Sequence, residues 1–111
     1  MSIDRCRRGV EFDAFHALRA LHRNEDGNFS SHDVGDLASF HFEKFAYICA
    51  DVHFGIIEEQ LKLLAQVIIE AAKEYAGGEK YYMHEEYWEK EVNARLDQFL
   101  DGRRNNTPRP S

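Results

Sequence analysis

The chain has 111 residues, of which 43% are hydrophobic and 31% are charged, and it contains only two cysteines. This length fits one domain, and the composition is that of a globular protein rather than a disordered one. No run of about 18 apolar residues is present, and residues 1–5 lack the apolar stretch of a secretory signal. We therefore expect a cytoplasmic protein without a membrane span.

The net charge of −6 is distributed unevenly. Both ends are basic, whereas residues 9–101 carry 19 of the 20 acidic side chains but only 8 of the 14 lysines and arginines. Because affinity for DNA comes largely from neutralising phosphates with Lys and Arg, this acidic body argues against direct contact with nucleic acid. We expect residues 1–8 to form a flexible basic arm, 9–101 a single helical domain, and 102–111 a disordered basic tail.

The first predicted helix spans residues 12–23, where Ala14, Leu18 and Leu21 share one face. Residues 24–28 then combine glycine with Asn and Asp, which is typical of a turn. Ser30 and Ser31 are both candidates for the N-cap of the next helix.

The segment from residue 34 to residue 75 carries two separate apolar stripes. One steps by fours and threes and consists of Val34, Ala38, His41, Phe45, Ile48 and Val52; the other steps by sevens and consists of Phe40, Tyr47, Phe54, Leu61, Ile68 and Tyr75. A surface helix normally has one apolar stripe. Two stripes indicate either a central helix covered on both sides by this chain's own helices, or a second face covered by another chain.

Gly55 leaves two structures open for this segment. Glycine costs about 1 kcal/mol relative to alanine inside a helix, so Gly55 either ends one helix or weakens a continuous one. A break would give a helical hairpin with a tight connection, whereas a continuous helix would project beyond a monomeric core and call for dimerisation. The seven-residue stripe passes unbroken through Phe54 and Leu61, which favours a continuous helix or one with a mild kink.

The glycine pair at residues 77–78 predicts the end of this segment, and a last helix is predicted over residues 83–101. Its apolar positions are Trp88, Val92, Leu96 and Phe99 or Leu100. No strand-like alternation appears between turn residues. We therefore predict an all-α fold, a small helical bundle with a long central helical segment, which forms an intertwined or side-by-side homodimer.

The sequence gives little support for catalysis or metal binding, and we expect no enzyme activity and no cofactor. Cys6 and Cys49 have neither disulfide-framework nor short metal-ligand spacing. Bundle metal sites use two Glu-x-x-His motifs, which are absent, so a metal protein built on His41 and His53 is the weakest alternative. No glycine-rich loop follows a predicted strand to hold phosphate.

Aromatic residues point instead to a surface that binds another protein. Tyr81, Tyr82 and Tyr87 cluster near the start of the last helix, and tyrosine is favoured at interface centres. These side chains would otherwise cap the end of the core. The residues predicted to bind a partner are Phe40, Tyr47, Phe54, Leu61, Tyr81, Tyr82 and Tyr87.

Residues 41–51 (HFEKFAYICAD) and 61–73 (LKLLAQVIIEAAK) resemble the paired helices of small pseudomonad regulatory proteins. In length, acidic body and helical layout, the chain resembles quorum-sensing antiactivators of the QslA type. The resemblance implies a helical homodimer that binds a LuxR-type (LasR-like) transcription activator and blocks its dimerisation, so that the activator cannot bind DNA. It carries over no individual contact residue. The rival hypothesis is a structural or phage-encoded helical dimer with another protein target, or none.

Overall fold

The computed structural model describes the backbone of residues 2–24, 30–76 and 78–106, and the side chains of residues 2–24, 30–75 and 88–103. The helices are α1 (Ile3–Asn24), α2 (Ser31–Ile48), α3 (Phe54–Ala76) and α4 (Gly78–Asn106). The described backbone contains no strand, which confirms the all-α class.

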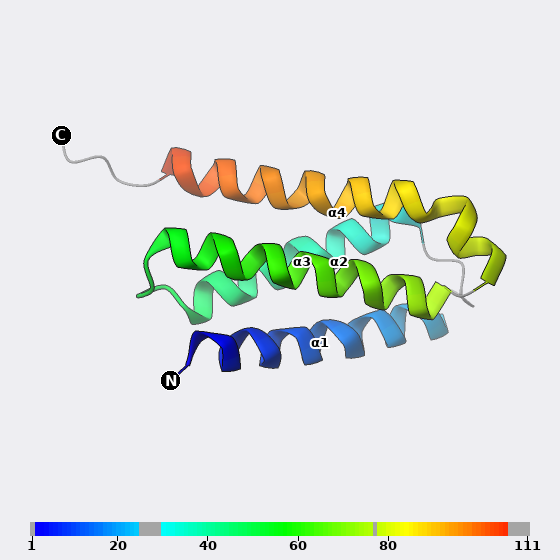
Figure 1. Cartoon of the computed structure of the whole chain (residues 1–111), viewed down its shortest axis with the longest axis horizontal. Helices are drawn as coiled ribbons and strands as arrows, with labels where there is room; N and C mark the ends of the chain where they lie inside the picture. Colours follow the sequence, from blue (N-terminus) through cyan, green and yellow to red (C-terminus); the bar gives the residue numbers. More distant parts are fainter. Residues whose placement is uncertain (1, 25–29, 77, 107–111) are drawn as a thin grey trace.

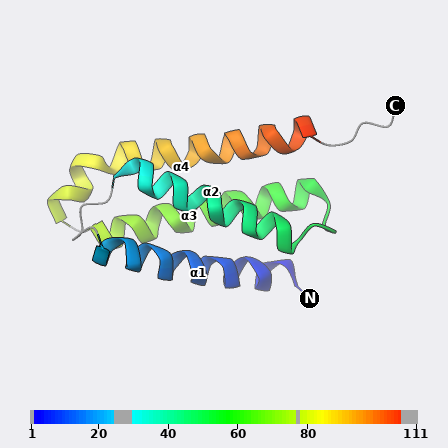
Figure 2. The same cartoon turned by 180° about the vertical axis from the view of Figure 1, so that it is seen from behind.

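The helices form a compact bundle in which α2 and α3 lie between α1 and α4 (Figure 1). Seen from behind, α2 lies in front of α3, so these two helices form opposite sides of the bundle (Figure 2). Each of them contacts both α1 and α4, whereas α1 and α4 do not touch within the described backbone. α1 and α3 run in one direction, and α2 and α4 run in the other (Figure 1).

All four helices contribute to one apolar core. The largest fully buried side chains include Leu18 of α1, Phe42 and Phe45 of α2, Leu61, Leu64 and Ile68 of α3, and Val92 of α4. Spacings of three and four place such residues on one side of a helix. The first stripe of α2 faces this core from Val34 to Phe45, as predicted, whereas Ile48 at its end is 49% exposed.

α2 begins with a capping box. The side-chain oxygen of Ser30 accepts a hydrogen bond from the backbone N–H of Asp33 at 3.2 Å, and the Asp33 carboxylate accepts one from the Ser30 N–H at 3.0 Å. This reciprocal pair satisfies two backbone donors at the helix start. Ser30, and not Ser31, is therefore the N-cap.

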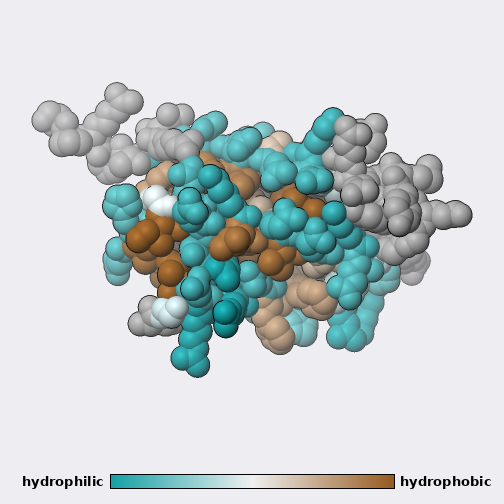
Figure 3. Space-filling view, in the orientation of Figure 1, coloured by the Kyte–Doolittle hydropathy of each residue, from teal (hydrophilic) through white to brown (hydrophobic). Residues whose placement is uncertain are grey.

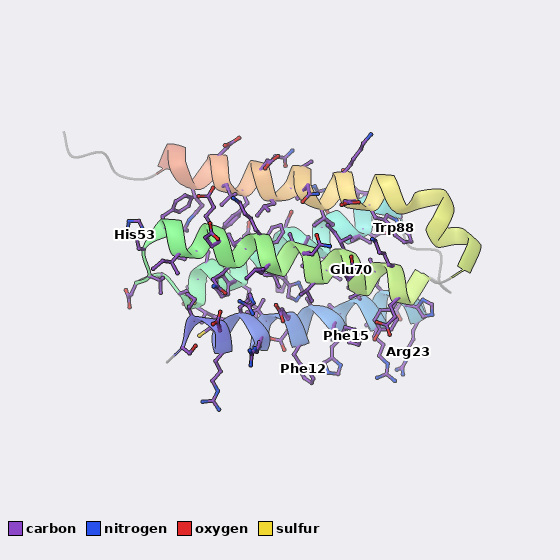
Figure 4. The ribbon with its side chains drawn as sticks, viewed as in Figure 1. Phe12, Phe15, Arg23, His53, Glu70 and Trp88 are labelled. Carbon is purple, nitrogen blue, oxygen red and sulfur yellow. The ribbon has the colours of Figure 1, made fainter. Side chains whose placement is uncertain are left out.

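The continuous central helix favoured by the sequence is wrong, because the chain turns between α2 and α3. Cys49 is the C-cap of α2, and its carbonyl accepts a hydrogen bond from the Val52 N–H. His53, at one end of the bundle (Figure 4), precedes α3, and its ring Nδ1 accepts a hydrogen bond from the Gly55 N–H at 3.1 Å. The break thus precedes Gly55, which lies in the first turn of α3. The His53 side chain caps the N-terminus of α3, a role that Ser or Asp commonly fills.

α1 begins at Ile3, so the arm that was expected to be flexible is helical from that residue onward. Arg7 forms ion pairs with Asp4 and Glu11, each at 2.9 Å, and also donates a hydrogen bond to Gln60 of α3. Side chains three and four positions apart meet on a helix surface, which explains the two ion pairs. The contact with Gln60 then fixes this first part of α1 against the bundle.

α4 extends beyond residues 83–101 at both ends. It begins at Gly78 and passes through Gly102, so residues 102–106 are helical rather than part of a disordered tail. Residues 107–111, the rest of that expected tail, lie outside the described residues, as does Gly77. Of the turn predicted at residues 24–28, Asn24 is the last residue of α1, and residues 25–28 lie outside the described residues.

Ion pairs join α2 to α1 and to α4. The Lys44 ammonium of α2 lies 2.6 Å from the Asp13 carboxylate of α1, and this hydrogen bond holds the pKa of Asp13 below its usual value. On the other side, Arg95 of α4 lies 2.7 Å from Asp36 of α2. α2 is therefore linked to both α1 and α4 through charged side chains near the surface.

Candidate protein–protein interface

One side of α2 carries exposed aromatic rings among acidic groups. The exposed residues on this side, which we call the α2 outer face, are His32, Asp36, Phe40, Glu43 and Tyr47. Their spacing of four, four, three and four forms one stripe at 3.6 residues per turn. Phe40 is 61% exposed and Tyr47 is 84% exposed. Covering two such rings with another molecule would lower the free energy, because it removes apolar surface from water.

The two exposed rings are well separated along α2. Phe40 and Tyr47 lie seven residues apart, or about 10 Å along the helix axis. The Phe40 ring packs edge-on against the ring of His41, with centroids 5.1 Å apart and planes at 77°. Glu43 lies between the two aromatic positions on the stripe. A complementary surface therefore offers two apolar pockets and a basic group between them.

The seven predicted interface residues do not form one surface. Phe40 and Tyr47 are exposed together, Phe54 is half-buried against the core, and Leu61 is fully buried inside it. Placing Leu61 on an outward face was therefore wrong. The remaining three predictions, Tyr81, Tyr82 and Tyr87, fall outside the described side chains.

The seven-residue stripe divides at the α2–α3 turn. Its α2 part, Phe40 and Tyr47, faces outward, whereas Leu61 and Ile68 of α3 face the core. A stripe defines one face only while the helix is continuous, because the turn at residues 49–53 gives α3 its own direction and rotation. The seven-residue spacing by itself does not predict that turn.

A second exposed apolar surface, which the sequence reasoning missed, lies between α1 and α3. We call it the α1–α3 groove; its volume is about 600 Å³, and it is lined by Phe15, Gln66, Val67, Glu70, Ala71, Lys73 and Glu74. The ring centroids of Phe15 and Tyr75 are 5.0 Å apart. Figure 4 shows Phe12 and Phe15 on α1 and Glu70 on α3.

The two helices that line the groove, α1 and α3, carry further exposed apolar side chains. Phe12 of α1 is 64% exposed, and Ile56 and Leu63 of α3 are 47% and 50% exposed. Figure 3 shows the α3 side of the molecule, where apolar patches are interrupted by hydrophilic side chains. The seven-residue interval between Ile56 and Leu63 was the available sequence signal, but it lay outside both stripes.

His41 is the one charged or polar residue found buried in the described part of the chain, at 3% exposure. Its Nδ1 lies 2.8 Å from the carbonyl oxygen of Leu37, one turn earlier. Burial lowers the pKa of His41, and the nearby charge of Lys44 lowers it further, against the opposing effects of Leu37 and Asp13. This environment favours a neutral ring whose Nδ1–H donates to Leu37.

Among the described side chains, no three His, Cys, Asp or Glu residues are grouped so that they could hold a metal ion. His41 belongs to the core beside Phe42 and Phe45, and His53 caps α3.

No protein-family model, curated protein or solved structure matches this chain. None of the helices, over the residues described, combines the length and apolar character needed to cross a bilayer.

Proposed function

We propose that this chain is a transcriptional antiactivator that binds a LuxR-type, LasR-like activator by protein–protein contact. Binding blocks dimerisation of the activator and so prevents it from binding DNA. The proposal combines the resemblance over residues 41–51 and 61–73 with the α2 outer face. The observation that carries it is the joint exposure of Phe40 and Tyr47 on one stripe of α2.

The two exposed rings of α2 would supply most of the binding free energy. Fully burying a large apolar side chain contributes roughly 1.5–3 kcal/mol, and a few such anchors dominate the affinity of most protein interfaces. Phe40 and Tyr47 are both available in the isolated chain, so binding needs no prior unfolding of the core. Glu43 adds a charge that selects a basic counterpart on the activator.

The mechanism follows from symmetry and charge. An activator that reads DNA as a dimer presents a self-complementary surface, and a ligand on that surface leaves only the monomer. The acidic body of this chain, with 19 acidic and 8 basic side chains over residues 9–101, does not compete for DNA itself. Blocking the dimer interface of the activator is an inhibitory mechanism that the acidic charge of this chain allows.

Self-association as a homodimer belongs to the same proposal. We assign it to the α1–α3 side, where Phe12 and Leu63 are exposed, because this leaves the α2 outer face open for the activator. α2 and α3 lie on opposite sides of the bundle, so the two surfaces do not obstruct one another (Figures 1 and 2).

Light scattering coupled to size exclusion tests both parts. The chain has a mass of 13.0 kDa, so a homodimer elutes with twice that mass, and addition of a LasR-like activator gives a defined mixed complex. A homodimer that ignores the activator favours the rival hypothesis of a helical dimer with another target. A monomer that ignores the activator contradicts the whole proposal.

Matched variants separate the two surfaces. Phe40→Asp and Tyr47→Asp should abolish the mixed complex while helical circular dichroism and the homodimer remain. Ile56→Asp and Leu63→Asp change exposed apolar residues on the opposite side and should weaken the homodimer only. Equal loss of activator binding in both pairs would contradict the assignment of the α2 outer face.

A further inference from the structure

Two thiols that are far apart in the sequence lie together at one end of the bundle. Cys6 belongs to the first turns of α1, and Cys49 is the C-cap of α2, 43 positions later. Both belong to the same packed region: Cys49 is part of the core cluster, and Cys6 packs against that cluster. The structure records both residues as thiols.

The antiparallel pairing of α1 and α2 explains the approach. The ion pair between Asp13 and Lys44 places these residues opposite one another. Two helical turns back from Asp13 the chain reaches Cys6, and about a turn and a half forward from Lys44 it reaches Cys49. The same register therefore brings the two cysteines to one level of the bundle.

The environments of the two thiols differ. Cys49 is only 4% exposed, whereas Cys6 is half-buried. Burial, together with the adjacent Cys6 thiol, which lies within hydrogen-bonding contact, raises the pKa of Cys49 to about 11. Cys49 is therefore protonated at neutral pH and is a weak first nucleophile.

We propose that Cys6 and Cys49 form a redox modification site, in which hydrogen peroxide converts the contacting thiols into an intramolecular disulfide. The site joins the start of α1 to the α2–α3 turn. It is independent of the antiactivator proposal, since it uses neither Phe40 nor Tyr47.

The reaction proceeds in two balanced steps. The Cys6 thiolate attacks one peroxide oxygen, so that an S–O bond forms, the O–O bond breaks, and hydroxide leaves as water after taking up a proton; Cys6 becomes a sulfenic acid. The Cys49 sulfur then attacks the Cys6 sulfur, which forms the S–S bond, breaks the S–O bond and releases a second water with the Cys49 proton. Two thiols and one peroxide thus give one disulfide and two waters.

One of the two cysteines lies where the backbone is no longer regular helix. Cys49 lies at the C-cap, outside the regular helix, with φ −106° and ψ 34°, so a small adjustment there does not disrupt the helix interior. The cross-link closes a long loop and restricts the unfolded chain. We therefore expect the oxidised protein to melt on the order of 10 °C higher than the reduced one.

The test uses the full-length reduced chain, treated with hydrogen peroxide, unfolded in denaturant, reacted with N-ethylmaleimide, and weighed as the intact protein. The proposal expects a monomer mass lower by two hydrogens, no added maleimide, and a peptide that links Cys6 to Cys49. Reduction by dithiothreitol should restore both thiols and the lower melting temperature. Two added maleimides, or a covalent dimer linked between chains, would overturn the proposal.

Single variants test the order of attack. Cys49→Ala keeps a small apolar side chain at the buried position, and Cys6 should then stop at a sulfenic acid that dimedone traps. In Cys6→Ser, which alters only the half-buried partner, Cys49 should remain a thiol under the same treatment. If Cys6→Ser is oxidised at Cys49 as fast as the wild type is oxidised, Cys49 is attacked first and the proposed order is wrong.

Discussion

The guanidinium of Arg95 on α4 lies 2.7 Å from the carboxylate of Asp36 on α2. The same side chain lies 3.0 Å from Glu91 and also contacts Ser39 and the His32 ring of α2. Asp36 makes the largest contribution to a raised pKa of Arg95, and Glu91 adds to it. One cation thus connects α2 and α4 at several points along the α2 surface.

Arg95→Met should lower the free energy of unfolding by about 1 kcal/mol, because it removes these contacts but keeps an apolar stem. Urea unfolding at low and high salt measures the effect, which should shrink as salt screens the charges. Lys62→Met, at an exposed position of α3, is the matched control and should change stability less. Equal effects in the two variants would show that the Arg95 cluster does not stabilise the bundle.

The pH dependence of folding should contain a contribution from His41. Burial lowers its folded pKa below the ordinary value of 6.5. As the pH falls through about 6.5, the unfolded chain binds a proton before the folded chain does, so the free energy of unfolding decreases. Well above that pH both states are neutral and this penalty vanishes.

His41→Leu isolates that contribution, because the other five histidines remain in both proteins. Free energies of unfolding for the wild type and the variant, measured between about pH 8 and pH 5, should show a shallower decline in the variant. Parallel curves would mean that His41 titrates alike in the folded and unfolded states.

The division of the seven-residue stripe predicts opposite outcomes for two residues that the spacing alone treats as equivalent. Leu61→Ala should cost about 2–5 kcal/mol, because it leaves a cavity in the core. Tyr47→Ala should change stability by less than about 0.5 kcal/mol, because that ring is 84% exposed. Chemical denaturation measures the free energy of unfolding of both variants relative to the wild type. Similar costs would indicate that Tyr47 is buried in solution, through self-association or otherwise.

The capping box at α2 separates two neighbouring serines. Ser30→Ala should cost about 1 kcal/mol, because it removes the acceptor for the Asp33 N–H. Ser31→Ala changes the first residue of the helix and should be nearly neutral. Thermal melts of the two variants provide the comparison, and a larger loss from Ser31→Ala would place the helix start one residue later.

Local chemistry was sufficient to predict the helical class, a serine N-cap and the core stripe from Val34 to Phe45. Each depends on groups within one or two turns of the same helix, and such groups interact in the same way whatever packs nearby. The exposure of Phe40 and Tyr47 also agrees with the second stripe, since α2 has only one side facing the core.

The α2–α3 turn was decided at longer range. Periodicity passes through residues 49–53 as though the helix continued, but a reversal there buries Leu61 and Ile68 beside Phe42 and Phe45. The apolar surface removed from water by that packing outweighs the backbone hydrogen bonds lost at the turn.

The contacts of Arg95 with Asp36 and of Cys6 with Cys49 join residues 59 and 43 positions apart. The sequence by itself determined the helical class, the serine N-cap and the core face of α2, because those properties depend on near neighbours. Only the tertiary structure decided which rings remain exposed and which thiols meet, because both depend on the direction and register with which one helix packs against another.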